Sequence, residues 1–196
     1  SHFSPLTALH LFLLYLFIFS ATTTPDLYPL SLHDALPISA EKVYRSKGPD
    51  TLFNVDLNVS GGAWLEWLPQ ETIIFDKARL RRRTCVEVAP GGKFLGAEML
   101  VFGRTAMGET LDHGLVRDTW EVRREGKLQW ADALHLAGDL TIPLNHPAGF
   151  GGARAAATSI LVADDAAEHL GFVRDVLSGM PDGVKCAATV VGGILV

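Results

Sequence analysis

Residues 52–59 alternate strictly between apolar and polar side chains, and this pattern restricts the fold more than any other feature of the sequence. The apolar positions are Phe53, Val55, Leu57 and Val59, and the polar positions between them are Asn54, Asp56 and Asn58. Successive side chains of a β-strand point to opposite faces, so this alternation predicts a strand with one buried face and one solvated face. The segment is therefore expected to be a half-buried strand.

A second alternation, from Arg79 to Val88, predicts another strand. Its inward set is Leu80, Thr84, Val86 and Val88, and its outward set is Arg79, Arg81, Arg83 and Glu87. Arg82 interrupts the inward set, so we expect this end of the strand to meet solvent. The run Arg81-Arg82-Arg83 then forms a solvated strand face, with docking against an acidic partner as the alternative.

Turn signals separate further strand-like segments about every ten residues, which is the spacing of an all-β sandwich, barrel or solenoid. They include Pro90-Gly91-Gly92 and Glu125-Gly126, the second of which predicts a hairpin turn. A helix is expected near residues 164–178, capped by Asp164 or Asp165 and ended by Gly179. The sequence thus predicts an all-β (mainly β) fold with one or two helices.

Residues 1–39 differ abruptly from the rest of the chain, because they contain no Lys or Arg. The apolar run at residues 11–19 is too short to span a bilayer, which takes about 20 apolar residues. A secretory signal is one reading, but no positive charge precedes the apolar run. We expect an artefactual or disordered leader at 1–39 and a β-domain at 40–196 that is incomplete at both ends.

Composition excludes several functions. The formal net charge of -5 argues against a nucleic-acid partner. Cys85 and Cys186 provide neither a disulfide framework nor paired metal-ligand spacing, so a reducing compartment is expected. No nucleophile elbow, phosphate loop or zinc-protease helix motif occurs in the sequence. The sequence therefore predicts a protein that is not an enzyme and does not enter a membrane.

Three short blocks, in this order and at these separations, resemble the UreD (UreH) family of urease accessory proteins. The blocks are Lys42 to Ser46, Gly62 to Phe75, and Glu98 with Phe102 to Glu109 leading into His113-Gly114. The resemblance implies a two-layered β-solenoid-like fold with a couple of helices. It also implies a cytoplasmic, non-enzymatic chaperone scaffold that helps to deliver nickel to apo-urease together with UreF and UreG, with no tightly bound cofactor and only transient nickel passage.

Polar side chains within or beside the second and third blocks are candidates for that passage: Glu66, Glu98, Glu109, Asp112 and His113. Carboxylate oxygens and an imidazole suit transient binding of a divalent cation. No tight metal site is expected, since adjacent residues of a strand, such as Asp112 and His113, point to opposite faces. The competing reading makes the carboxylates structural and His113 an exposed loop residue.

The remaining candidates are structural or concern partners. Lys42, Arg45 and Arg104 are expected to form structural ion pairs, Arg104 with either Glu98 or Glu109. Trp64 and Trp67 are candidates for a partner interface, with the domain core as the alternative. Two other functions stay open: a secreted β-sandwich that binds carbohydrate through its tryptophans, and a glycosidase that uses Glu66 and Glu98.

Overall fold

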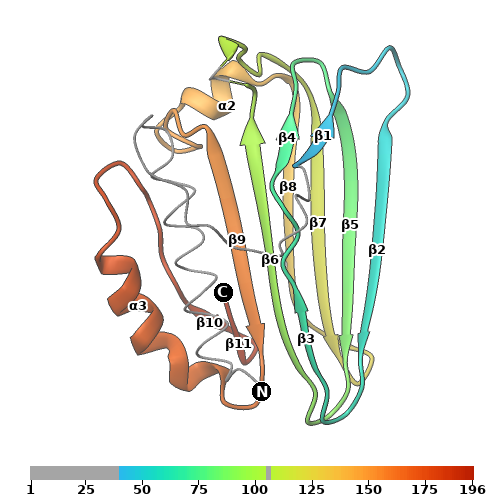
Figure 1. Cartoon of the computed structure of the whole chain (residues 1–196), viewed down its shortest axis with the longest axis vertical. Helices are drawn as coiled ribbons and strands as arrows, with labels where there is room; N and C mark the ends of the chain where they lie inside the picture. The colour runs from blue at the N-terminus through green and yellow to red at the C-terminus, as the bar shows by residue number, and fades with distance from the viewer. Residues whose placement is uncertain (1–39, 105–106) are drawn as a thin grey trace, which may run out of the picture.

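The computed structural model describes residues 40–104 and 107–196, which form two facing β-sheets (Figure 1). The leader expected at residues 1–39 lies outside the described residues. The seven strands of the large sheet are β1 (Glu41–Val43), β3 (Trp64–Trp67), β4 (Thr72–Ile74), β6 (Lys93–Phe102), β9 (Ala155–Val162), β10 (Val190–Val191) and β11 (Ile194–Leu195). The four strands of the small sheet are β2 (Thr51–Val59), β5 (Arg79–Val88), β7 (His113–Arg124) and β8 (Lys127–Asp139).

From β1 to β7 the chain passes back and forth between the two sheets. The strands β1, β4 and β6 of the large sheet are parallel to one another, and so are β2, β5 and β7 of the small sheet. Parallel neighbours need a long crossover, and here each crossover is a strand of the opposite sheet. This winding is that of a two-layered β-solenoid. It confirms the mainly β fold expected from the sequence.

A hairpin ends the winding. β7 and β8 are antiparallel and are joined at Glu125 and Gly126, whose φ angles are 51° and 71°. Two consecutive residues with positive φ are the requirement of a type I′ turn, whose twist matches that of paired strands. The expected hairpin is confirmed.

The alternation expected at residues 52–59 is also confirmed, because Asn54, Asp56 and Asn58 are exposed while Val59 is buried. The expectation for Arg82 was wrong. Its side chain lies between the two sheets and the residue is only 8% exposed. Two carboxylates from other strands pair with it there, and this pairing is what permits a guanidinium to be buried.

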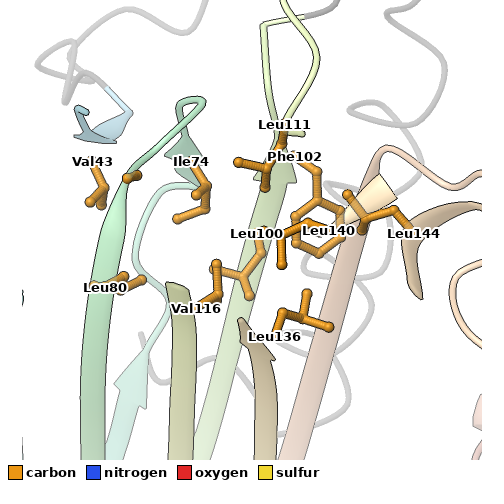
Figure 2. Close-up of a cluster of buried hydrophobic side chains, with 11 residues drawn as sticks. Val43, Ile74, Leu80, Leu100, Phe102, Leu111, Val116, Leu136, Leu140 and Leu144 are labelled. Atoms are coloured by element: carbon orange, nitrogen blue, oxygen red, sulfur yellow. The ribbon is translucent and has the colours of Figure 1, made fainter. Parts of the chain in front are cut away.

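Two apolar clusters fill the space between the sheets. Figure 2 shows one of them, which consists of Val43, Ile74, Ala78, Leu80, Leu100, Phe102, Leu111, Val116, Leu136, Leu140 and Leu144. The other lies further along the same strands and consists of Val59, Val86, Val88, Phe94, Trp120, Val122, Ile160, Val162 and Ile194. Both clusters take residues from both sheets, so they hold the two layers together.

The expected helix near residues 164–178 is present as a 3-10 turn, η2 (Ala166–His169), followed by α3 (Leu170–Ser178). Asp165 precedes η2 but makes no capping hydrogen bond, and its carboxylate lies 3.4 Å from Lys93 instead. Gly179 ends α3 as expected. α3 lies on the side of the large sheet away from the small sheet (Figure 1).

A shorter helix, α2 (Thr141–Asn145), follows β8 and buries Leu144 in the cluster of Figure 2. Among the described residues, no helix is long and apolar enough to cross a membrane.

Candidate functional site

A layer of charged side chains separates the two apolar clusters inside the sandwich. Arg82 of β5 lies between the inward residues Leu80 and Val86, which belong to different clusters. Glu98 of β6 and Asp118 of β7 hold the matching inward positions on their own strands. All three residues are buried, at 8%, 9% and 5% exposed respectively. Buried charges at the centre of an apolar core require a specific arrangement of partners.

Arg82 is the hub of this layer. Its Nη2 contacts Glu98 Oε1 and donates to Asp118 Oδ2 at 2.5 Å, and its Nε lies 3.2 Å from both Asp118 oxygens. Its Nη1 donates to Thr72 Oγ1 at 3.0 Å and lies 3.9 Å from a carboxylate oxygen of Glu41. The guanidinium therefore joins β5 to strands of both sheets.

Glu98 has a second donor. The indole Nε1 of Trp120 donates to Glu98 Oε2 at 2.6 Å, so both carboxylate oxygens are engaged. Burial and then the neighbouring Asp118 carboxylate raise the pKa of Glu98 to about 8, although the charge of Arg82 and the bond from Trp120 oppose this. Glu98 is thus able to hold a proton near neutral pH.

The pKa of Arg82 is raised, which keeps the guanidinium charged. Burial alone would lower it, but the hydrogen bond with Asp118 and the charge of Glu98 outweigh burial and raise the pKa of the guanidinium. The layer therefore contains a permanent positive charge beside two acidic groups, and a further acidic group, Glu41, lies at its edge.

A cavity of about 60 Å³ adjoins the charged layer between β6, β7, β8 and β9. Its walls are formed by Glu98, Leu100, Asp118, Trp120, Asp132, Leu134, Ala156 and Thr158. Asp132 is exposed, so the cavity leads from a surface carboxylate to the buried pair Glu98 and Asp118. A single water needs roughly 10–15 Å³, so the cavity has room for a few waters.

Of the nickel-path candidates named from the sequence, only Glu98 lies in this site. Glu66 is exposed and accepts a hydrogen bond of 2.6 Å from Trp64. Glu66 pairs in register with Leu95, whose side chain packs towards α3, whereas Glu98 faces the sandwich interior. The two carboxylates therefore lie on opposite faces of the large sheet and cannot flank one glycosidic bond.

Glu109 and Asp112 lie in the segment between β6 and β7, His113 is the first residue of β7, and all three form hydrogen bonds with Asp76. Arg104 donates to Glu109 at 2.6 Å, and the guanidinium lies 4.5 Å above the Phe75 ring. Both Asp112 and His113 are exposed, and their backbone N–H groups donate to the Asp76 carboxylate at 3.2 and 3.0 Å.

Lys42 and Arg45 are exposed, and neither has a carboxylate within ion-pair distance in the described part of the chain. Arg45 instead forms an isolated backbone bridge with Ala78. Across residues 40–104 and 107–196, no three histidine, cysteine or carboxylate side chains converge as a metal site would require.

The four tryptophans all contribute to packing. Trp120 is buried, and Trp64, Trp67 and Trp130 are half-buried against the apolar clusters. A flat platform of exposed indoles, as carbohydrate binding would use, is not formed by any of them.

Sequence reasoning missed Arg82 and Asp118 as site residues. Two signals were available. Arg82 occupies an inward position of its strand, and Asp118 falls at the alternate position between the apolar residues Val116 and Trp120. A charged residue in the inward set of one strand predicts an opposite charge in the inward set of a neighbouring strand.

The comparisons with known proteins agree with one another. Residues 37–196 match the family model described as UreD urease accessory protein. The chain is 52% identical over 161 residues to the urease accessory protein UreD of Magnetococcus marinus, covering 81% of this chain and 56% of the relative. It is 44% identical over 161 residues to the protein of that name from Methylobacterium sp. (strain 4-46), covering 81% and 57%. The chain spans about half the length of the curated relatives it matches.

Proposed function

The chain belongs to the UreD family of urease accessory proteins, and from this premise we propose that it helps nickel to reach apo-urease as a non-enzymatic scaffold. In this proposal it works in the cytoplasm within a complex with UreF and UreG. The observation that carries the proposal is the charged layer with its cavity. Buried carboxyl groups in the wall of a cavity are costly to desolvate, so stability alone does not explain them.

The chemistry of the layer suits passage better than storage. Oxygen ligands bind a divalent cation such as nickel less tightly than thiolate and imidazole sets do. Glu98 and Asp118 supply four oxygens, but Arg82 already occupies several of their lone pairs. A cation that enters the cavity must compete with a guanidinium, so it would be held briefly and released.

The exposed candidates have a different place in the proposal. Glu66, Asp112 and His113 are exposed and are available to a hydrated ion before it enters the protein or after it leaves. Glu109 is half-buried, and its carboxylate already accepts hydrogen bonds from Arg104 and from the backbone of Asp76. Trp64 and Trp67 are available to a partner only through the parts of their rings that the core leaves uncovered. We therefore propose that Glu98 and Asp118 line the interior passage and that Asp132 lies at its rim.

The experiment is nickel loading of urease in cells that express the urease subunits, UreF, UreG and this chain. Glu98→Gln and Asp118→Asn are tested singly and together, with urease activity and nickel per urease as the readouts. We expect at least a ten-fold loss of both readouts in the double variant. Because this variant removes both close partners of Arg82, urea unfolding and co-purification with apo-urease are used to establish that the chain still folds and assembles.

The matched control for each single variant is Glu168→Gln, which also neutralises one carboxylate, at an exposed position of η2. It should load nickel as the wild type does. Normal nickel content in the double variant, with the complex assembled, would refute the interior passage. Urease activity that does not depend on the wild-type chain would refute the accessory function itself.

A further inference from the structure

The outer face of the small sheet carries a patch of arginines that the interior site does not use. On β5 the inward side chains include Leu80 and Arg82, so Arg79, Arg81 and Arg83 point outward. On β7, Arg117 is paired in register with Arg81 and is exposed. We call these four residues, Arg79, Arg81, Arg83 and Arg117, the arginine patch. It sits on an acidic chain whose formal net charge is -5.

Part of the patch is held in place. Asp50 accepts a bond of 2.6 Å from Arg79 and also contacts Arg81, so one carboxylate orients two guanidiniums. The hydrogen bond from Arg81 is the main reason that the pKa of Asp50 is lowered. Both arginine side chains keep 40% of their surface exposed despite this contact. Groups that are already ordered lose less entropy on binding a partner.

The rest of the patch is weakly neutralised. Arg83 lies 3.7 Å from Asp56 and 3.5 Å from Glu121, and its side chain is 49% exposed. Among the described residues, no carboxylate lies within ion-pair distance of Arg117. The patch therefore has an excess of positive charge.

The kind of cation on this face is informative. No lysine occupies an outward position of β5 or β7. Arginine is enriched and lysine depleted at protein interfaces, because the planar guanidinium pairs with carboxylates through two parallel bonds. A face that served only solubility would have no reason to exclude lysine.

This face is also open in the described part of the chain. Figure 1 shows α3 on the far side of the large sheet and α2 near one end of the sandwich, so neither helix covers β2, β5 and β7. The two edge strands, β2 and β8, frame a surface four strands wide.

We propose that the arginine patch docks a partner protein through an acidic surface. The positive excess, the preference for arginine and the orientation imposed by Asp50 together favour carboxylates as the complementary groups. A nucleic acid is disfavoured by the acidic balance of the whole chain. The choice of proteins for the test rests on the proposed function.

The experiment measures the dissociation constants of this chain with apo-urease and with a UreF–UreG mixture, at low and high salt. The variant is Arg83→Glu with Arg117→Glu, which leaves the Asp50 contacts intact. The matched control is Lys127→Glu with Lys185→Glu, an equal charge change at two exposed positions away from the patch. Urea midpoints of both variants establish that they fold.

We expect the patch variant to weaken binding of one partner by more than ten-fold, with a reduced salt dependence, while the control stays within three-fold of the wild type. The proposal is overturned if the wild type binds none of these proteins, if both variants weaken binding equally, or if the patch variant loses affinity only for a duplex DNA probe. If binding depends on the arginine patch but nickel loading of urease is the same with and without the wild-type chain, the docking proposal stands and the proposed function is refuted.

Discussion

The guanidinium of Arg82 on β5 contacts the carboxyl group of Glu98 on β6, and this contact links one sheet to the other at the centre of the sandwich. Asp118 pairs with the same guanidinium, and the group lies between two apolar clusters. A buried ion pair contributes little net stability, because desolvation of the charges offsets their attraction. Its presence at this position is therefore better explained by function or by specification of the fold than by stability.

Removal of the positive charge from this layer should be strongly destabilising. Arg82→Met leaves the Asp118 carboxylate buried without its guanidinium and removes the donor to Glu98, and broken buried pairs cost about 3–5 kcal/mol. We expect a loss of that size in the free energy of unfolding, measured with urea. Arg83→Met removes an exposed arginine from the same strand and should cost less than about 1 kcal/mol. Equal losses in the two variants would contradict the assignment of Arg82 as the hub.

Neutralising the whole layer should restore part of this loss. A triple variant, Arg82→Met with Glu98→Gln and Asp118→Asn, buries no charge at these three positions. We expect it to be more stable than Arg82→Met alone by a few kcal/mol, since uncompensated charge is the main cost. If the triple variant is less stable than Arg82→Met, the loss of stability comes mainly from altered side-chain volume and packing and not from uncompensated charge.

The pKa of Glu98 predicts how stability changes with pH. The folded protein retains the Glu98 proton up to about pH 8, whereas the unfolded chain releases it near the ordinary glutamate value. Between these values the folded state binds more protons, so the contribution of Glu98 to stability falls as pH rises. Each unit of pKa difference is worth about 1.4 kcal/mol, which gives an effect of a few kcal/mol.

The measurement is urea unfolding of the wild type and of Glu98→Gln between pH 5 and pH 8. Glutamine does not titrate. The free energy of unfolding of the wild type, minus that of Glu98→Gln, should therefore decrease as the pH rises from 5 to 8. A constant difference would mean that Glu98 is ionised throughout and that Arg82 outweighs burial.

Substitutions at two glycines in the segment after β6 distinguish the cost of backbone strain from the cost of a steric clash. Gly103 and Gly108 both have positive φ, at 78° and 72°. An added Cβ at Gly103 would lie 2.8 Å from the Glu109 carbonyl oxygen, whereas at Gly108 no atom lies within 4 Å. Gly108→Ala should cost about 1 kcal/mol from strain alone, and Gly103→Ala should cost at least 1 kcal/mol more. Thermal unfolding measures the loss of stability in both variants. Equal losses would show that the Glu109 backbone moves to make room for the added Cβ.

Local patterns predicted the strands but not their partners. The alternation at residues 52–59 and the turn at Glu125-Gly126 depend on neighbours in sequence, so both could be read from the chain. The parallel winding could not, because a turn signal does not state whether the next strand enters the same sheet. Arg82 was misplaced for the same reason: its partners Glu98 and Asp118 are 16 and 36 residues away.

Trp120 should lower the pKa of Glu98, against the larger effect of burial. Its indole N–H donates to Glu98 Oε2 at 2.6 Å and thereby favours the carboxylate, which lowers the pKa of Glu98. Trp120→Phe keeps an aromatic ring in the apolar cluster but removes this donor. The pKa of Glu98 should rise further, and the free energy of unfolding should fall by about 1–3 kcal/mol because a buried acceptor loses its partner. Nuclear magnetic resonance of the Glu98 side chain measures the first effect, and urea unfolding measures the second.

Trp130→Phe is the control, since Trp130 packs against the same cluster without a bond to Glu98. A Glu98 pKa that is unchanged in Trp120→Phe would show that burial, Asp118 and Arg82 set it without a contribution from Trp120.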